Sequence, residues 1–348
     1  MSFHEIVEAA WKTYDPSRPI QRIADISAKV STNHVYRIKL GDGASVIAKL
    51  SYFGEYKHFV EDHTIINTLS NNLEAPFDNV LATSLMKGGR LFVYRHKKGK
   101  EDVWVVFYRP IKVMKQLPKR LEEEHIEKMA CQFAAFHQAC TTIRHSLPPS
   151  SKSMKTDIAE LEEYCRTGAG RDHFGEHTAL IIEHCRRFMY FYANYIKREI
   201  PVIPVFVDWN IGNFSVSKNL KLVARWDYDW FRMSSRIADF YFLARVVSDV
   251  GDRTVFTYNI DVLKEERFLL FLRKYHEKFP LKTYEIDMIP EMYRFFLLNY
   301  VLKLGRFFFR EDYANKLQAE VIEHHLPSIK HFETDLLKET LFSQTPQV

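Results

Sequence analysis

Three oxygen-bearing side chains near the middle of the chain have the types and spacing that phosphoryl transfer requires. Asp208 is followed five residues later by Asn213, and a second acid, Asp227, comes after a further short stretch of strand-forming residues. A carboxylate can orient and deprotonate a hydroxyl, while an amide oxygen and a second carboxylate can hold Mg²⁺ against nucleotide phosphates. The segment 208–227 therefore predicts a site that moves a phosphoryl group.

A predicted β-hairpin places two of these side chains at the same end. Residues 213–216 and 220–226 have strand-like composition, and Ser217-Lys218-Asn219 between them is a turn signal. Because a hairpin brings its two open ends together, we expect Asn213 and Asp227 to reach one cation. Mg²⁺ is commonly bound by one or two protein groups plus phosphates, which suits an Asn–Asp pair.

The same residues also admit a purely structural interpretation. In an Asp-X-Asn turn the side chains can simply bond neighbouring backbone amides, with no ligand involved. Asp208 and Asn213 alone do not distinguish the two interpretations, whereas Asp227 at the matching end of the hairpin favours the metal site. Asp229 is left open between a second site carboxylate and an acid paired with a nearby arginine.

Length and composition favour a two-lobed globular protein. The chain has 348 residues, 46% of them hydrophobic, and a formal net charge of +5 that is spread along the sequence. It lacks dense basic patches, a signal-peptide pattern, and any uncharged apolar run near the roughly 18 residues of a membrane span. We therefore expect a soluble, cytoplasmic protein that binds neither nucleic acid nor membrane; the oligomeric state is left open.

Strand patterns dominate the first third of the chain and helical patterns the rest. The predicted elements are helix 3–14, hairpin 35–50, helix 59–69, hairpin 90–108 and helices 121–140, 157–165, 178–197, 263–279, 290–309 and 312–325. The glycine-containing segment 168–170 is expected to be a plain loop. The patterns predict an α+β fold with a small antiparallel sheet lobe, residues 1–108, and a larger, mostly helical lobe, residues 109–348.

The residues around the hairpin carry a resemblance to a known family. Segment 205–240 resembles the catalytic core of the aminoglycoside phosphotransferase–choline kinase family, a branch of the protein-kinase-like fold. That family has His-Gly-Asp, four residues, Asn, a hairpin, Ile-Asp-Phe or similar, and a later Asp; the matches here are Asp208, Asn213, Asp227 and Asp239. The resemblance implies that Asp208 is the catalytic base. It also implies that Asn213 and Asp227 hold Mg²⁺, and that Asp239 is the structural carboxylate of the following helix.

The N-terminal third fits the same pattern. Lys49, in the strand-like run 46–50, looks like the third-strand lysine that contacts the α- and β-phosphates of the nucleotide. Glu61, twelve residues later and in the next predicted helix, is the partner that the resemblance implies for it. Without the downstream residues, Lys49 would read as an exposed lysine at the end of a strand.

The resemblance also indicates where the rest of the nucleotide lies. Ser31, Thr32 and Asn33 occupy the phosphate-covering loop between the first two strands. Small residues and backbone amides in such a loop can cradle phosphate. The edge of the adenine is expected against the backbone around Tyr108, within residues 107–111.

The chain departs from the family pattern at positions that bear on activity. Phe206 stands two residues before the base, where the family usually has His, so one polar support of the catalytic loop is absent. Trp226 replaces a smaller aliphatic residue before the metal Asp. No activation segment of the Ala-Pro-Glu type occurs, which favours a small-molecule substrate over a protein substrate. His137 is expected to be structural, beneath the catalytic loop.

These residues predict an ATP- and Mg²⁺-dependent phosphotransferase. Its acceptor is expected to be a hydroxyl of a small metabolite, such as an aminoglycoside, an amino alcohol, a sugar or a homoserine-like compound. The alternative, motivated by Phe206, is a catalytically silent nucleotide-binding pseudokinase that serves as a scaffold or regulator. A third interpretation, a helical adaptor without a ligand, predicts that Asp227→Ala changes only local stability.

Overall fold

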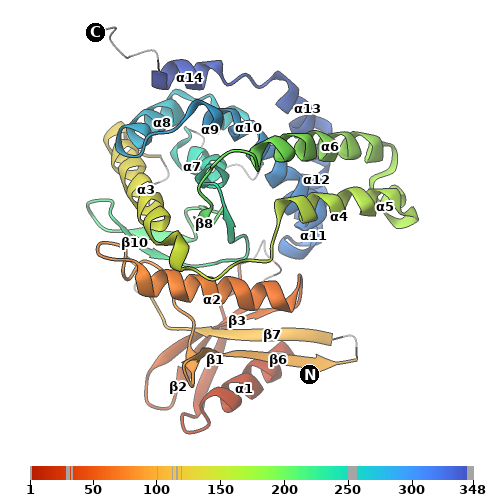
Figure 1. Ribbon diagram of the computed structural model, residues 1–348. Helices are drawn as coiled ribbons and strands as arrows, with labels where there is room; N and C mark the ends of the chain where they lie inside the picture. The colour runs from red at the N-terminus through yellow and green to blue at the C-terminus, as the bar shows by residue number, and fades with distance from the viewer. Residues whose placement is uncertain are drawn as a thin grey trace.

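The computed structural model describes residues 2–28, 32, 34–99, 101–111, 113–114, 117–118, 120–249 and 257–342. Within these residues a small sheet with two helices is followed by a larger body of helices. Figure 1 shows the sheet with its helices at the bottom and the helical body above it. This arrangement confirms the predicted α+β fold with two lobes. Among the described helices none is both long and apolar enough to cross a membrane.

The N-terminal sheet has five antiparallel strands in the order β1-β2-β3-β7-β6. Its strands are β1 (Ile20–Asp25), β2 (His34–Leu40), β3 (Ser45–Ser51), β6 (Val93–Lys98) and β7 (Glu101–Tyr108). The predicted hairpin 35–50 is therefore confirmed as β2 and β3, with Gly43 at φ 84° in the turn between them, a conformation that glycine adopts without strain.

Two helices cover the opposite faces of this sheet. Helix α1 (Phe3–Tyr14) begins at a capping box, in which Ser2 and Glu5 bond each other's backbone, and buries Ile6 and Trp11. Helix α2 (Tyr56–Asn72) lies on the side that faces the helical body (Figure 1).

The central strand β7 shows how the two faces are separated. Because side chains alternate along a strand, Val105 and Phe107 join a small core under α1, whereas Val106 and Tyr108 join the large core shared with α2. A separate small core supports an N-terminal lobe that packs as a unit, while the exact boundary after residue 108 stays a prediction.

The rest of the chain is mostly helical. Its α-helices are α3 (Glu123–Ile143), α4 (Met154–Arg166), α5 (Gly168–Phe174), α6 (Thr178–Tyr195), α7 (Phe240–Val247), α8 (Glu266–Lys278), α9 (Thr283–Asp287), α10 (Ile289–Phe296), α11 (Gly305–Phe308), α12 (Glu311–Glu320), α13 (Leu326–Ser328) and α14 (Asp335–Phe342). The predicted helix 290–309 is not continuous, because α10 runs into a π-helix, Leu297–Lys303, before α11 begins.

Two local predictions were wrong. The segment expected to be a loop at 168–170 begins helix α5, and a Cβ atom on Gly170 would lie 1.9 Å from the carbonyl oxygen of Tyr164. Close packing of two helices, not a turn, therefore requires that glycine. In the N-terminal lobe, Arg90 belongs to a separate small hairpin, β4 (Met86–Lys87) and β5 (Arg90–Leu91), rather than to β6.

Four short strands lie between the sheet lobe and the helices. Strands β9 (Phe214–Val216) and β10 (Leu222–Arg225) form the predicted hairpin, and β8 (Ile203–Val205) pairs with β11 (Arg232–Ser234). Figure 1 shows β8 and β10 at the level where the two lobes meet. The loop between β8 and β9, residues 206–213, is called the Asp208 loop below.

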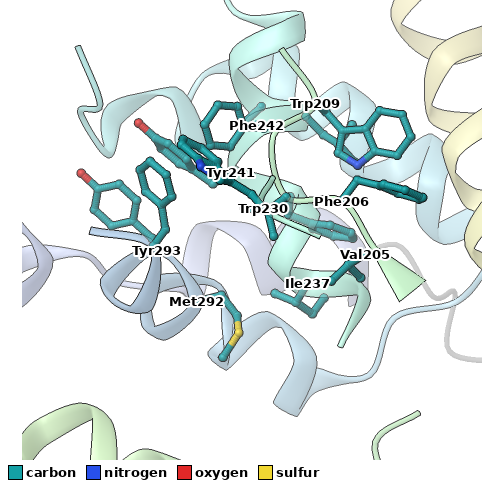
Figure 2. Packing of buried hydrophobic residues seen from close by; sticks show 14 of the residues in the cluster. Val205, Phe206, Trp209, Trp230, Ile237, Tyr241, Phe242, Met292 and Tyr293 are labelled. Atoms are coloured by element: carbon teal, nitrogen blue, oxygen red, sulfur yellow. The ribbon is translucent and has the colours of Figure 1, made fainter. Parts of the chain in front are cut away.

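Aromatic side chains pack tightly behind the Asp208 loop. Figure 2 shows Phe206 and Trp209 next to each other, with ring centroids 5.6 Å apart. Trp230 lies nearby against Phe242, at 5.5 Å. All four rings are buried. Trp209 and Trp230 are thus packing residues in this structure, and their buried rings form part of the apolar core next to the loop.

Candidate active site

The Asp208 loop begins with a strained backbone. Val207 has φ 58°, in the left-handed region that β-branched residues rarely adopt. Strand β8 accordingly ends at Val205, two residues earlier. Short turns follow, in which the amide of Asp208 donates to the carbonyl of Phe206 at 2.6 Å. Such a conformation persists only where the surroundings hold it in place.

Asp239 holds the start of the loop. Its Oδ1 accepts hydrogen bonds from the amides of Phe206, at 3.0 Å, and Val207, at 2.7 Å. Its Oδ2 accepts from His137 Nε2 at 3.0 Å, and His137 Nδ1 in turn accepts from the hydroxyl of Tyr275 at 2.8 Å. Because the carboxylate and the loop amides are buried together, these bonds hold the start of the loop in one conformation.

The expected role of Asp239 therefore needs correction. The residue is structural, but its side chain makes no capping bond to α7, the helix that it precedes. It lies at the end of a 3₁₀ helix, Arg236–Asp239, and reaches across to the Asp208 loop instead. His137 lies beneath the loop, as expected, and contacts it through Asp239.

Asp208 and Asn213 meet within the loop. Asp208 Oδ2 accepts from Asn213 Nδ2 at 2.8 Å, and Oδ1 accepts from the amide of Asn210 at 3.2 Å. Both bonds come from the loop itself, so they set the orientation of the carboxylate. The turn interpretation describes the bond to the Asn210 amide, but the bond to Asn213 joins two side chains. The carboxylate is half-buried rather than enclosed in the core, so these bonds are compatible with a role in catalysis.

The register of the hairpin brings the second acid to the same place. Phe214 pairs with Arg225, and the amide of Trp226 donates to the carbonyl of Asn213 at 3.0 Å. Asp227 follows directly, with φ 66°, a second strained position in the left-handed region. The structure thus brings together Asp208, Asn213 and Asp227 at the open end of one hairpin.

Lys49 reaches this end from the N-terminal sheet. Its Nζ lies 2.8 Å from Asp227 Oδ1 and 2.5 Å from Asp229 Oδ1, and the side chain is 6% exposed. Burial lowers the pKa of Lys49, but the two carboxylates raise it by more, so the net pKa is raised. Burial raises the pKa of Asp227, but the Lys49 ammonium, together with Arg225 and the amide of Asp229, outweighs burial, so the net pKa is lowered. The pair is therefore charged at neutral pH.

The predicted pairing of Lys49 with Glu61 was wrong. Glu61, on α2, accepts from the amide and the hydroxyl of Ser151 at 2.9 and 2.7 Å. Asp229 is the second carboxylate on Lys49. Its sequence position, two residues after Asp227, is compatible with a site residue or with a partner of a nearby arginine, and the structure shows the former.

The side chain of Tyr108 belongs to the contact between β7 and α2. Its hydroxyl bonds His63 Nε2, and His63 Nδ1 donates to the carbonyl of Phe59 at 2.8 Å. Burial lowers the pKa of His63 to about 3, so the ring is neutral. Any contact of Tyr108 with a nucleotide, which stays a prediction, would therefore use its main chain.

Of the three residues predicted to cover phosphate, Ser31 and Asn33 lie outside the described residues. Thr32 contacts the helical body: its amide donates to the carbonyl of Phe308 at 3.1 Å, and its hydroxyl donates to the carbonyl of Phe307. The β1–β2 connection thus reaches across to α11 at Thr32.

Arg225 is a site residue that the sequence did not reveal. It is the last residue of β10, it is 0% exposed, and its guanidinium donates to the carbonyls of Asp208 and Asn213. The available signal was a charged residue at the end of an otherwise apolar strand, which is ordinary for an exposed strand end. Only its burial marks it as unusual.

The donor set suits a magnesium ion that is also bound by phosphate. Asn213, Asp227 and Asp229 offer the hard oxygen ligands that Mg²⁺ prefers. Within the described ranges no group of three or more His, Cys, Asp or Glu residues could hold a metal ion by itself. A cation at the hairpin end would therefore need further ligands, which nucleotide phosphates supply in many kinases.

Solved structures with the same overall fold are small-molecule kinases. An amicoumacin kinase in complex with AMP-PNP, Ca²⁺ and amicoumacin superposes with a TM-score of 0.66 at 14% identity, over 97% of each chain. A microcompartment-associated aminopropanol kinase gives 0.61 at 15% identity, over 94% of this chain and 98% of the other. The GDP complex of aminoglycoside 2'-phosphotransferase-IIIa gives 0.55 at 14% identity, over 94% and 99%.

These likenesses confirm the predicted fold class. They extend over nearly the whole chain, so both lobes take part, including the C-terminal helices. At such low identity they show the fold alone, which many different activities can share. No family model matches the sequence, and no curated protein matches it either.

Proposed function

We propose that this chain is a kinase that moves the γ-phosphoryl group of ATP, with Mg²⁺, to a hydroxyl of a small molecule. The observation that carries the proposal is the bond between Asp208 and Asn213 at one end of the hairpin whose other end bears Asp227. Phosphoryl transfer needs a carboxylate for the acceptor beside groups that bind the metal and the phosphates. The fold shared with an amicoumacin kinase and an aminopropanol kinase supports the same reaction class.

In this proposal Asp208 acts on the acceptor. The bonds from Asn210 and Asn213 hold its carboxylate in one orientation, so it can receive the acceptor hydroxyl without losing rotamer freedom at that moment. The carboxylate orients the hydroxyl and accepts its proton late in a loose transition state.

The phosphates are handled from the other side. Asn213, Asp227 and Asp229 are the residues that would hold Mg²⁺, which when bound neutralises charge on the phosphate oxygens. Lys49 lies against two of these carboxylates in the structure. We propose that it turns from them to the α- and β-phosphates of the nucleotide, because a triphosphate offers the ammonium more negative charge.

Two observations support the proposed acceptor class: the fold neighbours, and a sequence without an activation segment of the Ala-Pro-Glu type. The neighbours include an aminopropanol kinase and complexes with amicoumacin, kanamycin and spectinomycin. We therefore propose an alcohol in a small, polar metabolite, and amino alcohols and aminoglycosides as the first compounds to test.

A catalytically silent nucleotide-binding protein is the second candidate. Phe206 favours it, because its ring can donate no hydrogen bond where the family usually has His. The ion pairs of Lys49 with Asp227 and Asp229 favour it too, because they must open before phosphate can bind. The bonds from Asp239 to the loop amides argue for the active kinase, since they keep the loop in one conformation.

The test is nucleotide consumption by the purified protein with Mg²⁺ and a panel of amino alcohols, aminoglycosides, sugars and homoserine-like compounds, using ATP and GTP in parallel. Asp208→Asn should lower kcat by about 10²–10⁴-fold, the usual contribution of a general base. Asp312→Asn, the same change at an exposed position of α12, should leave kcat unchanged. Nucleotide binding without turnover of any acceptor would support the silent protein, and wild-type turnover by Asp208→Asn would refute the assignment of the base.

A further inference from the structure

Arg225 occupies a fixed position under the Asp208 loop. Its amide donates to the carbonyl of Val80 at 2.7 Å, and its carbonyl accepts from the amide of Ala82 at 3.0 Å. The hydroxyl of Tyr228 also donates to that carbonyl, at 2.8 Å. Both the amide and the carbonyl of Arg225 are thus bonded to the segment 80–82, so the guanidinium extends from a fixed backbone position.

The guanidinium spans both ends of the segment that carries the proposed base and metal ligand. One terminal nitrogen donates to the carbonyl of Asp208 at 2.9 Å, and the other donates to the carbonyl of Asn213 at 3.2 Å. Because the guanidinium is planar and rigid, two such bonds set the separation of the two carbonyls as well as their positions.

Aromatic rings complete the environment of this cation. The guanidinium carbon lies 5.3 Å from the ring centroid of Phe206, 5.2 Å from that of Trp209 and 5.8 Å from that of Tyr228. Three π faces around one buried cation compensate for part of its lost hydration. Phe206 is therefore well suited to this place, since a neutral ring there adds no second titrating group beside the arginine.

The charge of Arg225 also acts on the site. Burial lowers the pKa of Arg225, and the carboxylates of Asp208 and Asp227, which raise it, offset only part of this effect, so the net pKa is lowered. A guanidinium starts from so high a pKa that it stays charged in proteins. In the opposite direction, Arg225 adds to Lys49 in lowering the pKa of Asp227.

We propose that Arg225 is a positioning residue of the active site, whose guanidinium sets the distance and orientation between Asp208 and Asn213. This inference rests on the proposed phosphotransfer for its effect on rate, whereas its effect on the loop does not. Arg225 acts through the main chain of the two residues and touches neither reacting group. Misplacement of catalytic groups by about 1 Å can cost on the order of 10²-fold in rate.

The experiment compares Arg225→Met and Arg225→Lys with a matched control, Arg267→Met. Arg267, on α8, is another buried arginine that donates to two main-chain carbonyls, those of Val247 and Leu121, away from the loop. The first measurement is hydrogen exchange of the amides of residues 207–213, followed by mass spectrometry at equal fractions of folded protein. The second is steady-state kinetics with the acceptor and nucleotide that the wild-type protein uses.

In Arg225→Met the amides of residues 207–213 should exchange at least about 10-fold faster than in wild type. Local opening of the loop then no longer has to break the two guanidinium–carbonyl hydrogen bonds. The kcat of this variant should fall about 10–100-fold, with the KM for nucleotide changed less than about 3-fold, because positioning is lost and nucleotide contacts remain. Arg225→Lys keeps the charge but not the fork, so it should lie closer to Arg225→Met than to wild type. Arg267→Met should change stability without changing exchange in 207–213.

Three results would overturn the proposal. Unchanged exchange in Arg225→Met shows that the guanidinium does not hold the loop. Wild-type behaviour of Arg225→Lys shows that charge alone suffices, and equal effects of Arg267→Met show a general loss of stability. If wild type turns over no acceptor at all, the proposed function fails, and the exchange data still decide whether Arg225 holds the loop. Arg225→Lys serves for both measurements if Arg225→Met does not fold.

Discussion

Removal of the Asp239 carboxylate probes how the loop that carries Asp208 is held. The carboxylate is fully buried and accepts three hydrogen bonds. They come from the amides of Phe206 and Val207, at 3.0 and 2.7 Å, and from His137 Nε2, at 3.0 Å. Asp239→Ala therefore leaves three buried donors without their acceptor.

The expected loss can be worked out from these three bonds. Each buried donor without a partner costs about 1–3 kcal/mol, so three cost roughly 3–9 kcal/mol. Water entering the space of the lost carboxylate recovers part of this, and we expect Asp239→Ala to lower the free energy of unfolding by about 3–6 kcal/mol. Asp239→Asn keeps one oxygen for the two loop amides, but its amide nitrogen cannot accept from His137 Nε2. One donor then loses its acceptor, so we expect a smaller loss, about 1–3 kcal/mol.

The assay is urea unfolding at pH 7.5 followed by circular dichroism. Asp42→Ala is the control: this exposed carboxylate pairs with Arg18 at 2.7 Å, and such surface pairs contribute little to stability because water screens them. The reasoning is refuted if Asp239→Ala loses no more than the control. It is also refuted if Asp239→Asn and Asp239→Ala lose the same amount, because the retained oxygen would then be without effect.

Three further outcomes are expected. Between pH 6.5 and about 3, the buried His63 binds a proton only in the unfolded state, so the free energy of unfolding falls as the pH decreases through that window. In urea unfolding experiments at several pH values, His63→Gln should reduce this pH dependence by up to about 1.4 kcal/mol per pH unit. An unchanged pH dependence would contradict the burial of a neutral His63. Gly170→Ala should lower the melting temperature, since the new Cβ meets a main-chain carbonyl at 1.9 Å, whereas Gly168→Ala in the same helix should not; equal effects would argue against the close packing. Lys49→Met should raise the pKa of Asp227, because the ammonium that offsets burial is lost, and a carboxyl-carbon NMR titration that shows no rise would count against the ion pair.

Local patterns in the sequence were sufficient for several elements. The apolar spacing of residues 3–14 and the glycine turn near residue 43 predicted α1 and the β2–β3 hairpin, and both formed as expected. The hairpin that brings Asn213 beside the strand before Asp227 was predictable for the same reason, whereas its exact register came only from the structure. In each case the interacting residues are close in sequence, so residue type and spacing decide the outcome.

Other features depend on how distant segments pack. Helix α5 is a more local case: the glycines at 168 and 170 favour a loop, and the contact of Gly170 with Tyr164 of the preceding helix α4 is seen only in the structure. Arg225 looks like an ordinary strand-end arginine until the Asp208 loop and three aromatic rings close over it. Asp239 reaches the loop amides across 32 and 33 residues of chain, and nothing in its immediate neighbours indicates that direction.

The sequence by itself determined which side chains could do chemistry and that Asp208, Asn213 and Asp227 would gather at one hairpin. Only the tertiary structure decided that Lys49 meets Asp227 and Asp229 instead of Glu61. That contact joins residues 178 positions apart, and it depends on how α2 and the sheet dock on the helical body. Hydrogen bonds between neighbouring residues follow from the local sequence. Which of several carboxylates pairs with the buried Lys49 depends instead on how the two lobes pack against each other.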